Sequence, residues 1–397
     1  MTRYLFRQSL LSLIKLLVFA TIMFFLIQLI MPGDYVDQFS LFMNNQEREA
    51  MREQLGLNLP IGQRYLYWMG RLARFDLGES FTGESINDIL GRVVPPTLLV
   101  FFVGTALAFM IGMWLGKATA WRGTGLVSRL ATLGGITLFT SFPPWLAWLL
   151  AYFLTKGRQY VVMGERGGLR AAAFQGLDAQ LWAVADLTPA EVTLRMFLTL
   201  LASLLLCLML NVLLRRLIRR GLPGPVFVLL VATGTVGLWY LLGMEHLALD
   251  IVQISWLAIL TYTLLSFGET MLIMQSSMTE VMKEEYVNTA HAKGLPGPAV
   301  REKHVARNAL LPVLSRFIIS LPYLITGVVI VESSVGWPGM GTTMWNALYW
   351  QNMPVVMAVV LIVGVLSLVA RLILDVIIAY VDPRIRYTSQ HITTGQV

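Results

Sequence analysis

The sequence predicts an all-α, polytopic membrane protein. Of its 397 residues, 56% are hydrophobic and 13% are charged, whereas soluble domains carry roughly 25% charged residues. The mean hydropathy is +0.67, and the apolar residues gather in runs long enough to cross a hydrocarbon core of about 30 Å. The single cysteine, Cys207, lies inside such a run, so an internal disulfide is excluded.

The apolar runs predict about eight membrane spans. The first is too long for a signal peptide and lacks an A-x-A cleavage motif, so we expect it to be retained. The expected spans cover residues 9–31, 97–116, 130–154, 196–214, 225–243, 251–274, 309–331 and 354–380. They divide the chain into a first helix within 1–31, an extracytoplasmic segment at 32–96, two spans at 97–155, a section with two further spans at 156–250 and a core at 251–390.

The extracytoplasmic segment contains an amphipathic pattern. Apolar side chains recur at helical spacing between Ile61 and Phe75, close to Arg64, Arg71 and Arg74. This pattern predicts a helix lying on the membrane surface rather than a substrate site.

Small residues and prolines mark the packing of the spans. Glycine or alanine stands at every fourth position from Gly104 to Gly116, which predicts a ridge where another helix approaches closely. The proline pair at 143–144, and Pro312 with Pro322, predict kinks or interruptions in their spans.

The basic residues indicate the topology. With the N-terminus inside, the five inner segments hold 16 lysines and arginines in 82 residues, and the four outer segments hold 11 in 135. Because cytoplasmic loops collect positive charge, both termini and the loop at 275–308 are expected in the cytoplasm. Much of the net charge of +7 is therefore explained by the membrane topology, and no nucleic-acid partner is expected. Arg215, Arg216, Arg219 and Arg220 are expected to stop translocation and to face lipid.

No motif for energy conversion or metal binding occurs in the sequence. A G-x-x-x-x-G-K-[ST] phosphate loop is absent, so transport by this chain requires an ion gradient or a partner ATPase. No H-E-x-x-H pair is present, and no metal site is expected. A charge inside a span costs roughly 2.5 to 3.5 kcal/mol on insertion scales, and besides Lys15 in the first span four such charges are candidates for a function: Glu269, Arg316, Arg371 and Asp375. Glu269 has no partner nearby in the sequence and is a candidate for a translocation path or a subunit contact.

A polar segment at 278–308 separates two strongly apolar runs. No helix breaker occurs from Met278 to Lys293, and the G-L-P-G-P sequence at 294–298 then predicts a left-handed cap and a stop. A second helix is expected from Ala299. Such a helix-stop-helix projection is suited to dock into a partner protein.

This segment resembles the cytoplasmic coupling loop, or EAA motif, of ABC importer permeases in the peptide and nickel transport family. Asn288, Thr289, Ala290 and Gly294 occupy the E-A-A…G positions, and A-L-L-P at 309–312 occupies the I-x-L-P positions, with the leading Glu and first Ala replaced. The resemblance extends to P-G-D at 32–34, to 55–80, to V-V-P-P-T-L-L at 93–99, to Glu332 with G-W-P-G-M-G at 336–341, and to D-P-R-I-R-Y at 382–387.

The resemblance implies the first, B-type permease of such a system, with the type I importer fold and six core spans. The pair at 196–243 is then an insertion, peripheral in the membrane, and 156–195 enlarges the outer surface. The implied partners are a second homologous permease, two cytoplasmic ATP-binding subunits that bind ATP and Mg²⁺, and an extracytoplasmic substrate-binding protein, all at the inner membrane of a prokaryote. No cofactor is expected in this chain.

The resemblance also assigns roles to residues. The ATPase-coupling residues are expected to be Glu285, Tyr286, Asn288, Thr289, Ala290, Lys293 and Gly294, and Glu269 and Glu332 are candidates for the translocation path. No catalytic residue is expected. The solute is expected to be an oligopeptide or dipeptide, although the same family handles nickel and oligosaccharides. The alternative is a stand-alone ion-coupled transporter or a membrane scaffold.

Overall fold

The computed structural model describes residues 2–30, 35–39, 42–123, 125–154, 162–163, 169–170, 177–218 and 221–381. The P-G-D turn, the D-P-R-I-R-Y sequence and Arg219 with Arg220 lie outside these residues. The long helices are α1 (Thr2–Ile30), α4 (Ile86–Arg122), α5 (Leu126–Phe139), α6 (Pro143–Leu154), α8 (Pro189–Leu217), α9 (Gly224–Leu241), α10 (Glu245–Val281), α13 (Ala306–Val335) and α15 (Met353–Val381).

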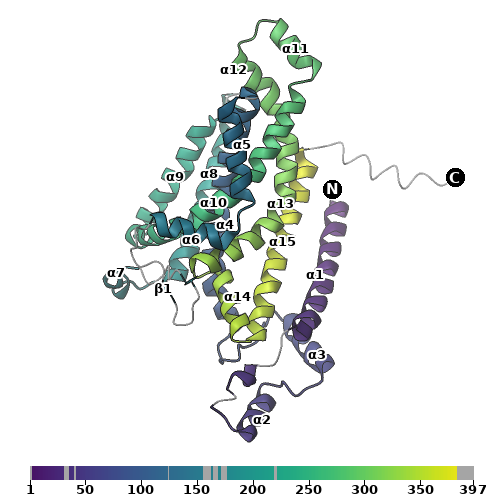
Figure 1. Ribbon diagram of the computed structural model, residues 1–397, viewed down its shortest axis with the longest axis vertical. Helices are drawn as coiled ribbons and strands as arrows, with labels where there is room; N and C mark the ends of the chain where they lie inside the picture. Colours follow the sequence, from purple (N-terminus) through teal and green to yellow (C-terminus); the bar gives the residue numbers. More distant parts are fainter. Residues whose placement is uncertain are drawn as a thin grey trace, which may run out of the picture.

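Shorter elements occupy both ends of this bundle (Figure 1). They are η1 (Tyr35–Phe39), α2 (Asn45–Gln54), α3 (Ile61–Leu72), α7 (Ala179–Ala183), α11 (Glu285–Ala292), α12 (Gly297–Ala299), the π-helix η3 (Val300–Val305) and α14 (Met340–Tyr349). Two-residue strands β1 (Val162–Met163) and β2 (Leu169–Arg170) pair antiparallel. The bundle therefore has an α11 end and an α14 end, and α2 lies beyond the latter.

The described helices account for six to eight membrane spans. Six of them, α1, α4, α8, α9, α10 and α15, are singly long and apolar enough, and two bent pairs bring the number up to eight. The expected number of spans is confirmed. The helices α4, α8 and α10 extend beyond the expected apolar runs at both ends, whereas α1 and α9 end one or two residues before theirs.

The helix α4 shows the largest extension, since it begins at Ile86 rather than near residue 97 and includes Pro95 and Pro96. Each proline lacks the N–H that would bond the carbonyl four residues earlier. Those carbonyls belong to Gly91 and Arg92, which are both exposed. Solvent can satisfy them, so the helix passes through the prolines.

The prolines at 143–144 and 322 coincide with two sharp bends. The predicted span at 130–154 is two helices, because α5 ends at Phe139 and α6 starts at Pro143 with a bend of 110°. The second bend, of 55°, separates Gly297–Leu321 from Tyr323–Val335 and falls at Pro322. Pro312 lies within the first part of that pair, where no such bend occurs.

The small-residue ridge of α4 packs directly on α10, which confirms its predicted role. A Cβ atom on Gly112 would stand 2.7 Å from the carbonyl oxygen of Phe267, and one on Gly116 would stand 2.7 Å from that of Met271. The helix α5 also approaches α10, since a Cβ on Gly268 would stand 2.5 Å from the carbonyl oxygen of Gly135 in α5. At these contacts the helix backbones touch directly, which small residues permit in membrane proteins.

The extra pair α8 and α9 packs at the periphery of the bundle (Figure 1). Two hydrogen bonds join its helices. The hydroxyl oxygens of Ser203 and Thr235 lie 2.6 Å apart, and Trp239 Nε1 donates to Thr199 Oγ1 at 2.9 Å. Arg195, Arg215 and Arg216 are exposed near the two ends of α8. Between them, and along α9, the large exposed side chains are apolar: Leu198, Leu205, Leu206, Met209, Val212, Leu213, Leu229 and Val236. This outer face is suited to lipid.

The amphipathic helix is present as α3, and part of its apolar face contacts α1. The ring centroid of Phe24 in α1 lies 5.3 Å from that of Trp68 and 5.4 Å from that of Tyr65. Its expected position on the membrane surface stays a prediction, to which the structure adds this contact with α1. Phe75 lies beyond the helix, with φ +59° and an exposed side chain.

Hydrogen bonds fasten the segment after α3 to the α14 end. Arg71 Nε donates to Asp76 Oδ2 at 2.8 Å, and the Gly78 amide donates to Asp76 Oδ1 at 2.9 Å. These bonds lower the pKa of Asp76 below its ordinary value. Farther along, Asn352 Nδ2 donates to Ser80 Oγ at 2.6 Å in a buried contact, which ties this segment to the start of α15.

We expect Gly112→Ala to destabilise the protein by about 1–3 kcal/mol, because even a methyl group must displace the α10 backbone. The measurement is thermal unfolding in detergent, followed by tryptophan fluorescence. Gly134→Ala in α5 is the matched control, since a Cβ there meets nothing within 4 Å. Equal transition temperatures for Gly112→Ala and Gly134→Ala would contradict the backbone contact.

Candidate functional site

The segment between α10 and α13 folds into a compact projection at one end of the bundle (Figure 1). The uninterrupted helix expected from Met278 to Lys293 is wrong, because α10 ends at Val281 and α11 starts only at Glu285. The break lets Val287 turn back onto the same hydrophobic cluster that contains Met278. Burial of an apolar side chain thus outweighs continuation of the helix.

The predicted stop after α11 is confirmed. Gly294 has φ +72°, and its amide donates to the carbonyl of His291 at 2.9 Å. This left-handed conformation disfavours any residue with a Cβ atom. The second helical part begins at Gly297 rather than Ala299 and continues through α12 and η3 into α13. The projection is therefore rigidly continuous with a membrane helix.

A small hydrophobic core lies inside the projection. Its fully or nearly fully buried members are Ala120, Met274, Met278, Val287, Ala290, Val300, Val305, Ala306, Ala309 and Val313, from α4, α10, α11, η3 and α13. Ala290 is only 4% exposed. Its expected contact with a partner is therefore corrected, because Ala290 supports the projection from within.

The other expected coupling residues form one exposed surface: Glu285, Tyr286, Asn288, Thr289, Lys293 and Gly294. Tyr286 is also anchored, since Asn308 Nδ2 of α13 donates to its hydroxyl at 2.7 Å. An ion pair of 3.2 Å between Lys117 Nζ and Glu302 Oε2 joins α4 to η3. The surface carries both signs of charge on a fixed scaffold, which is suited to docking a protein.

Glu269, a candidate for the translocation path, lies in α10, which packs against α13. It is half-buried, whereas Arg316 of α13, another charge inside a span, is exposed. Among the described residues no ion pair within 4 Å joins the two, so the role of Glu269 in a path stays a prediction.

Glu332, the other candidate for the path, is fully buried near the α14 end. Its Oε2 accepts a hydrogen bond from the Gly341 amide at 2.9 Å. A Cβ atom on Gly339 would stand 2.2 Å from Glu332 Oε1, so the carboxylate fills the space that a side chain would need. In this conformation Glu332 organises the turn into α14 and lines no open surface.

The same glycine-rich turn is fastened to the prolines of α4. The Met340 amide donates to Thr97 Oγ1 at 2.8 Å, and Trp337 Nε1 donates to the Pro96 carbonyl at 3.2 Å. Trp337 is 1% exposed. Two sequence motifs separated by some 240 residues, V-V-P-P-T-L-L and G-W-P-G-M-G, thus form one buried contact.

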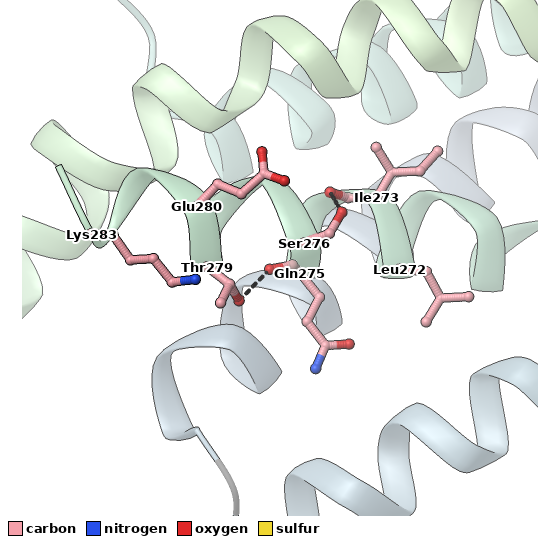
Figure 2. Close-up of a pocket in the computed structure, with 7 residues that line it drawn as sticks. All are labelled: Leu272, Ile273, Gln275, Ser276, Thr279, Glu280 and Lys283. Carbon is pink, nitrogen blue, oxygen red and sulfur yellow. Dashed lines mark hydrogen bonds between the residues drawn. The ribbon is translucent and has the colours of Figure 1, made fainter.

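A surface groove of about 690 Å³ runs along α10 where it approaches α11 (Figure 2). It is lined by Leu272, Ile273, Gln275, Ser276, Thr279, Glu280 and Lys283. Sequence reasoning missed this face, although polar residues at helical spacing on an apolar helix were an available signal. One acid and one base on an open face indicate a protein contact rather than an enclosed substrate site. Among the described residues, no three His, Cys, Asp or Glu side chains gather in a group that could hold a metal.

Comparisons with known proteins agree with this geometry. Residues 220–387 match the family described as binding-protein-dependent transport system inner membrane component. The oligopeptide transport system permease protein AppB of Bacillus subtilis (strain 168) is 29% identical over 98% of this chain and 100% of its own length. The dipeptide transport system permease protein DppB of Alkalihalophilus pseudofirmus is 26% identical over 96% of this chain and 98% of its own length. These alignments include the region of α8 and α9, so the extra pair is not peculiar to this chain.

We expect Ala290→Asp to loosen the projection, because it buries an unpaired charge in the small core. Thr289→Asp is the matched control, since its side chain is exposed on the same helix. The measurement is the rate of trypsin cleavage at Lys283, Lys293 and Arg301 in the detergent-solubilised protein. Cleavage should quicken at least several-fold for Ala290→Asp alone, and equal rates for the two variants would contradict the burial of Ala290.

Proposed function

Because this chain belongs to the inner membrane components of binding-protein-dependent transport systems, with residues 220–387 carrying their domain, we propose that it is the B-type permease subunit of an ATP-driven importer of oligopeptides or dipeptides. The names of its relatives, which are oligopeptide and dipeptide permeases, support the solute class. The observation that carries the proposal is the projection at 285–308, whose exposed surface is held on a core shared by three membrane helices.

The projection transmits force between a partner ATPase and the spans. The exposed surface of α11 docks into the partner, and the core beneath it joins α11 to α4, α10 and α13. Movement of the projection therefore displaces these helices together. Binding and hydrolysis of ATP by the partners shift the protein between outward-facing and inward-facing states through this linkage.

The complete transporter contains a second homologous permease, two ATP-binding subunits that hold ATP and Mg²⁺, and an extracytoplasmic substrate-binding protein. This chain supplies no catalytic residue and holds no cofactor. The α11 end and both termini lie in the cytoplasm of a prokaryote, and the α14 end, with α2, α3 and α7, faces the binding protein. The surfaces of α8 and α9 face membrane lipid.

Affinity purification from native membranes tests this assembly. We expect this chain to co-isolate with a sister permease and two ATPases. Isolation of a lone homo-oligomer would instead favour a stand-alone ion-coupled transporter or a membrane scaffold. Binding assays of the purified binding protein with peptides, sugars and metal ions would then identify the solute.

We expect Gly294→Val to abolish solute-stimulated ATP hydrolysis by the assembled complex while membrane insertion is preserved. A β-branched residue at φ +72° is strained, at a cost of about 1–2 kcal/mol or more, and relief of that strain redirects α11. The matched control is Gly125→Val, since Gly125 has φ −63° and a Cβ there meets only the Arg122 carbonyl oxygen, at an ordinary contact distance of 4.0 Å. Coupled turnover that is unchanged in Gly294→Val would refute the role of this stop.

A further inference from the structure

Glu332 places a carboxyl group where solvent does not reach it. The residue is 0% exposed, and its Oε2 accepts one hydrogen bond, from the Gly341 amide at 2.9 Å. Among the residues that the structure describes, no donor lies within hydrogen-bond distance of Oε1. A carboxylate can accept about four hydrogen bonds, and its burial is unfavourable unless they are made. The acid is therefore poorly satisfied in this conformation.

Thr97 of α4, whose hydroxyl bonds the adjoining turn, does not supply the missing donor. Its hydroxyl has one proton, which it donates to the Val93 carbonyl at 3.1 Å, and its oxygen accepts from the Met340 amide at 2.8 Å. The turn also closes tightly on the acid, because a Cβ atom on Gly339 would collide with Glu332 Oε1. The carboxyl group thus holds the turn while one of its oxygens lacks a donor.

This acid lies where three helices meet at the α14 end. Glu332 is in the last turn of α13, and its partner Gly341 is in the first turn of α14. The same turn donates two hydrogen bonds to α4, at the Thr97 hydroxyl and the Pro96 carbonyl. We call this contact the outer latch, formed by Thr97, Glu332, Gly339, Met340 and Gly341. Separation of α14 from α4 and α13 opens the latch and exposes the acid to water.

From these contacts, and resting on the proposed function, we propose that Glu332 is a positioning residue that sets how readily the outer end of the permease opens. In the closed latch it holds α14 against α13 but loses its own hydration. When the latch opens, water satisfies both oxygens. The acid therefore makes the closed state less stable than a neutral side chain of the same shape would. Such destabilising groups are kept where activity needs a change of conformation, here the opening that admits the solute.

Glu332→Gln tests the proposal in the full complex, because the amide has the shape of the carboxylate, can accept from Gly341 and carries no charge. In detergent, we expect thermal unfolding about 2 °C or more above that of the wild type. In proteoliposomes supplied with the binding protein, uptake of trialanine should fall about threefold or more, since the closed state is favoured. A purely structural cap would instead leave stability unchanged or lowered and uptake unchanged.

Gly339→Ala tests the latch from the opposite direction, since its Cβ atom collides with Glu332 Oε1 and forces the turn apart. Opening is measured in a Cys207→Ser background as the rate at which maleimide labels Met340→Cys, because Met340 is 0% exposed in the closed latch. Without the binding protein, we expect labelling to be about threefold faster with Gly339→Ala and about threefold slower with Glu332→Gln.

Glu191→Gln is the matched control, since Glu191 also accepts a hydrogen bond at a helix start, from the Thr188 amide at 2.8 Å, but is exposed. It should neither raise stability nor change uptake. The proposal is overturned if Glu332→Gln is no more stable than the wild type, transports equally fast or does not assemble, or if both latch variants shift labelling in one direction. If the wild-type complex takes up no peptide although its binding protein binds peptides, the proposed function itself fails, whereas unfolding and labelling test the latch without any solute.

Discussion

The direct contact between the backbones of α4 and α10 is the constraint on which the rest of the structure depends. In lipid, burial of apolar surface provides little attraction between helices, so close packing must hold them together. Gly112 and Gly116 allow that packing along α4, and Gly268 allows α5 to approach α10 as closely. The helices α8 and α13 then pack around this central pair.

The projection at the α11 end is an extension of the same central pair. Met274 and Met278 of α10 and Ala120 of α4 enter its small core and meet Val287 and Ala290. Since these contacts are buried and continuous with α13, the projection cannot move independently of the membrane helices. At the opposite end, the turn around Glu332 fastens α13 and α14 to α4. The central helices are therefore anchored at both ends.

Charge and polarity divide the lateral surface of the protein into two kinds. The middle parts of α8 and α9 expose apolar side chains, whereas α13 exposes Arg316, and α10 presents a groove that includes Glu280 and Lys283. Lipid tolerates the first kind and penalises the second. This asymmetry explains how one chain can contact the bilayer on one side and a solute path or a second subunit on another.

The sequence by itself determined the all-helical membrane class, the number of spans, the packing role of the α4 ridge and the stop at Gly294, because each depends on local composition, spacing or backbone conformation. The tertiary structure alone decided that Ala290 is buried, that α10 breaks before Glu285 and that the V-V-P-P-T-L-L and G-W-P-G-M-G sequences meet. These features arise from contacts between residues distant in the chain, and no periodicity within one helix reveals which face of a neighbour it will meet. The substrate path belongs to this second group, since it depends on which surfaces lie together.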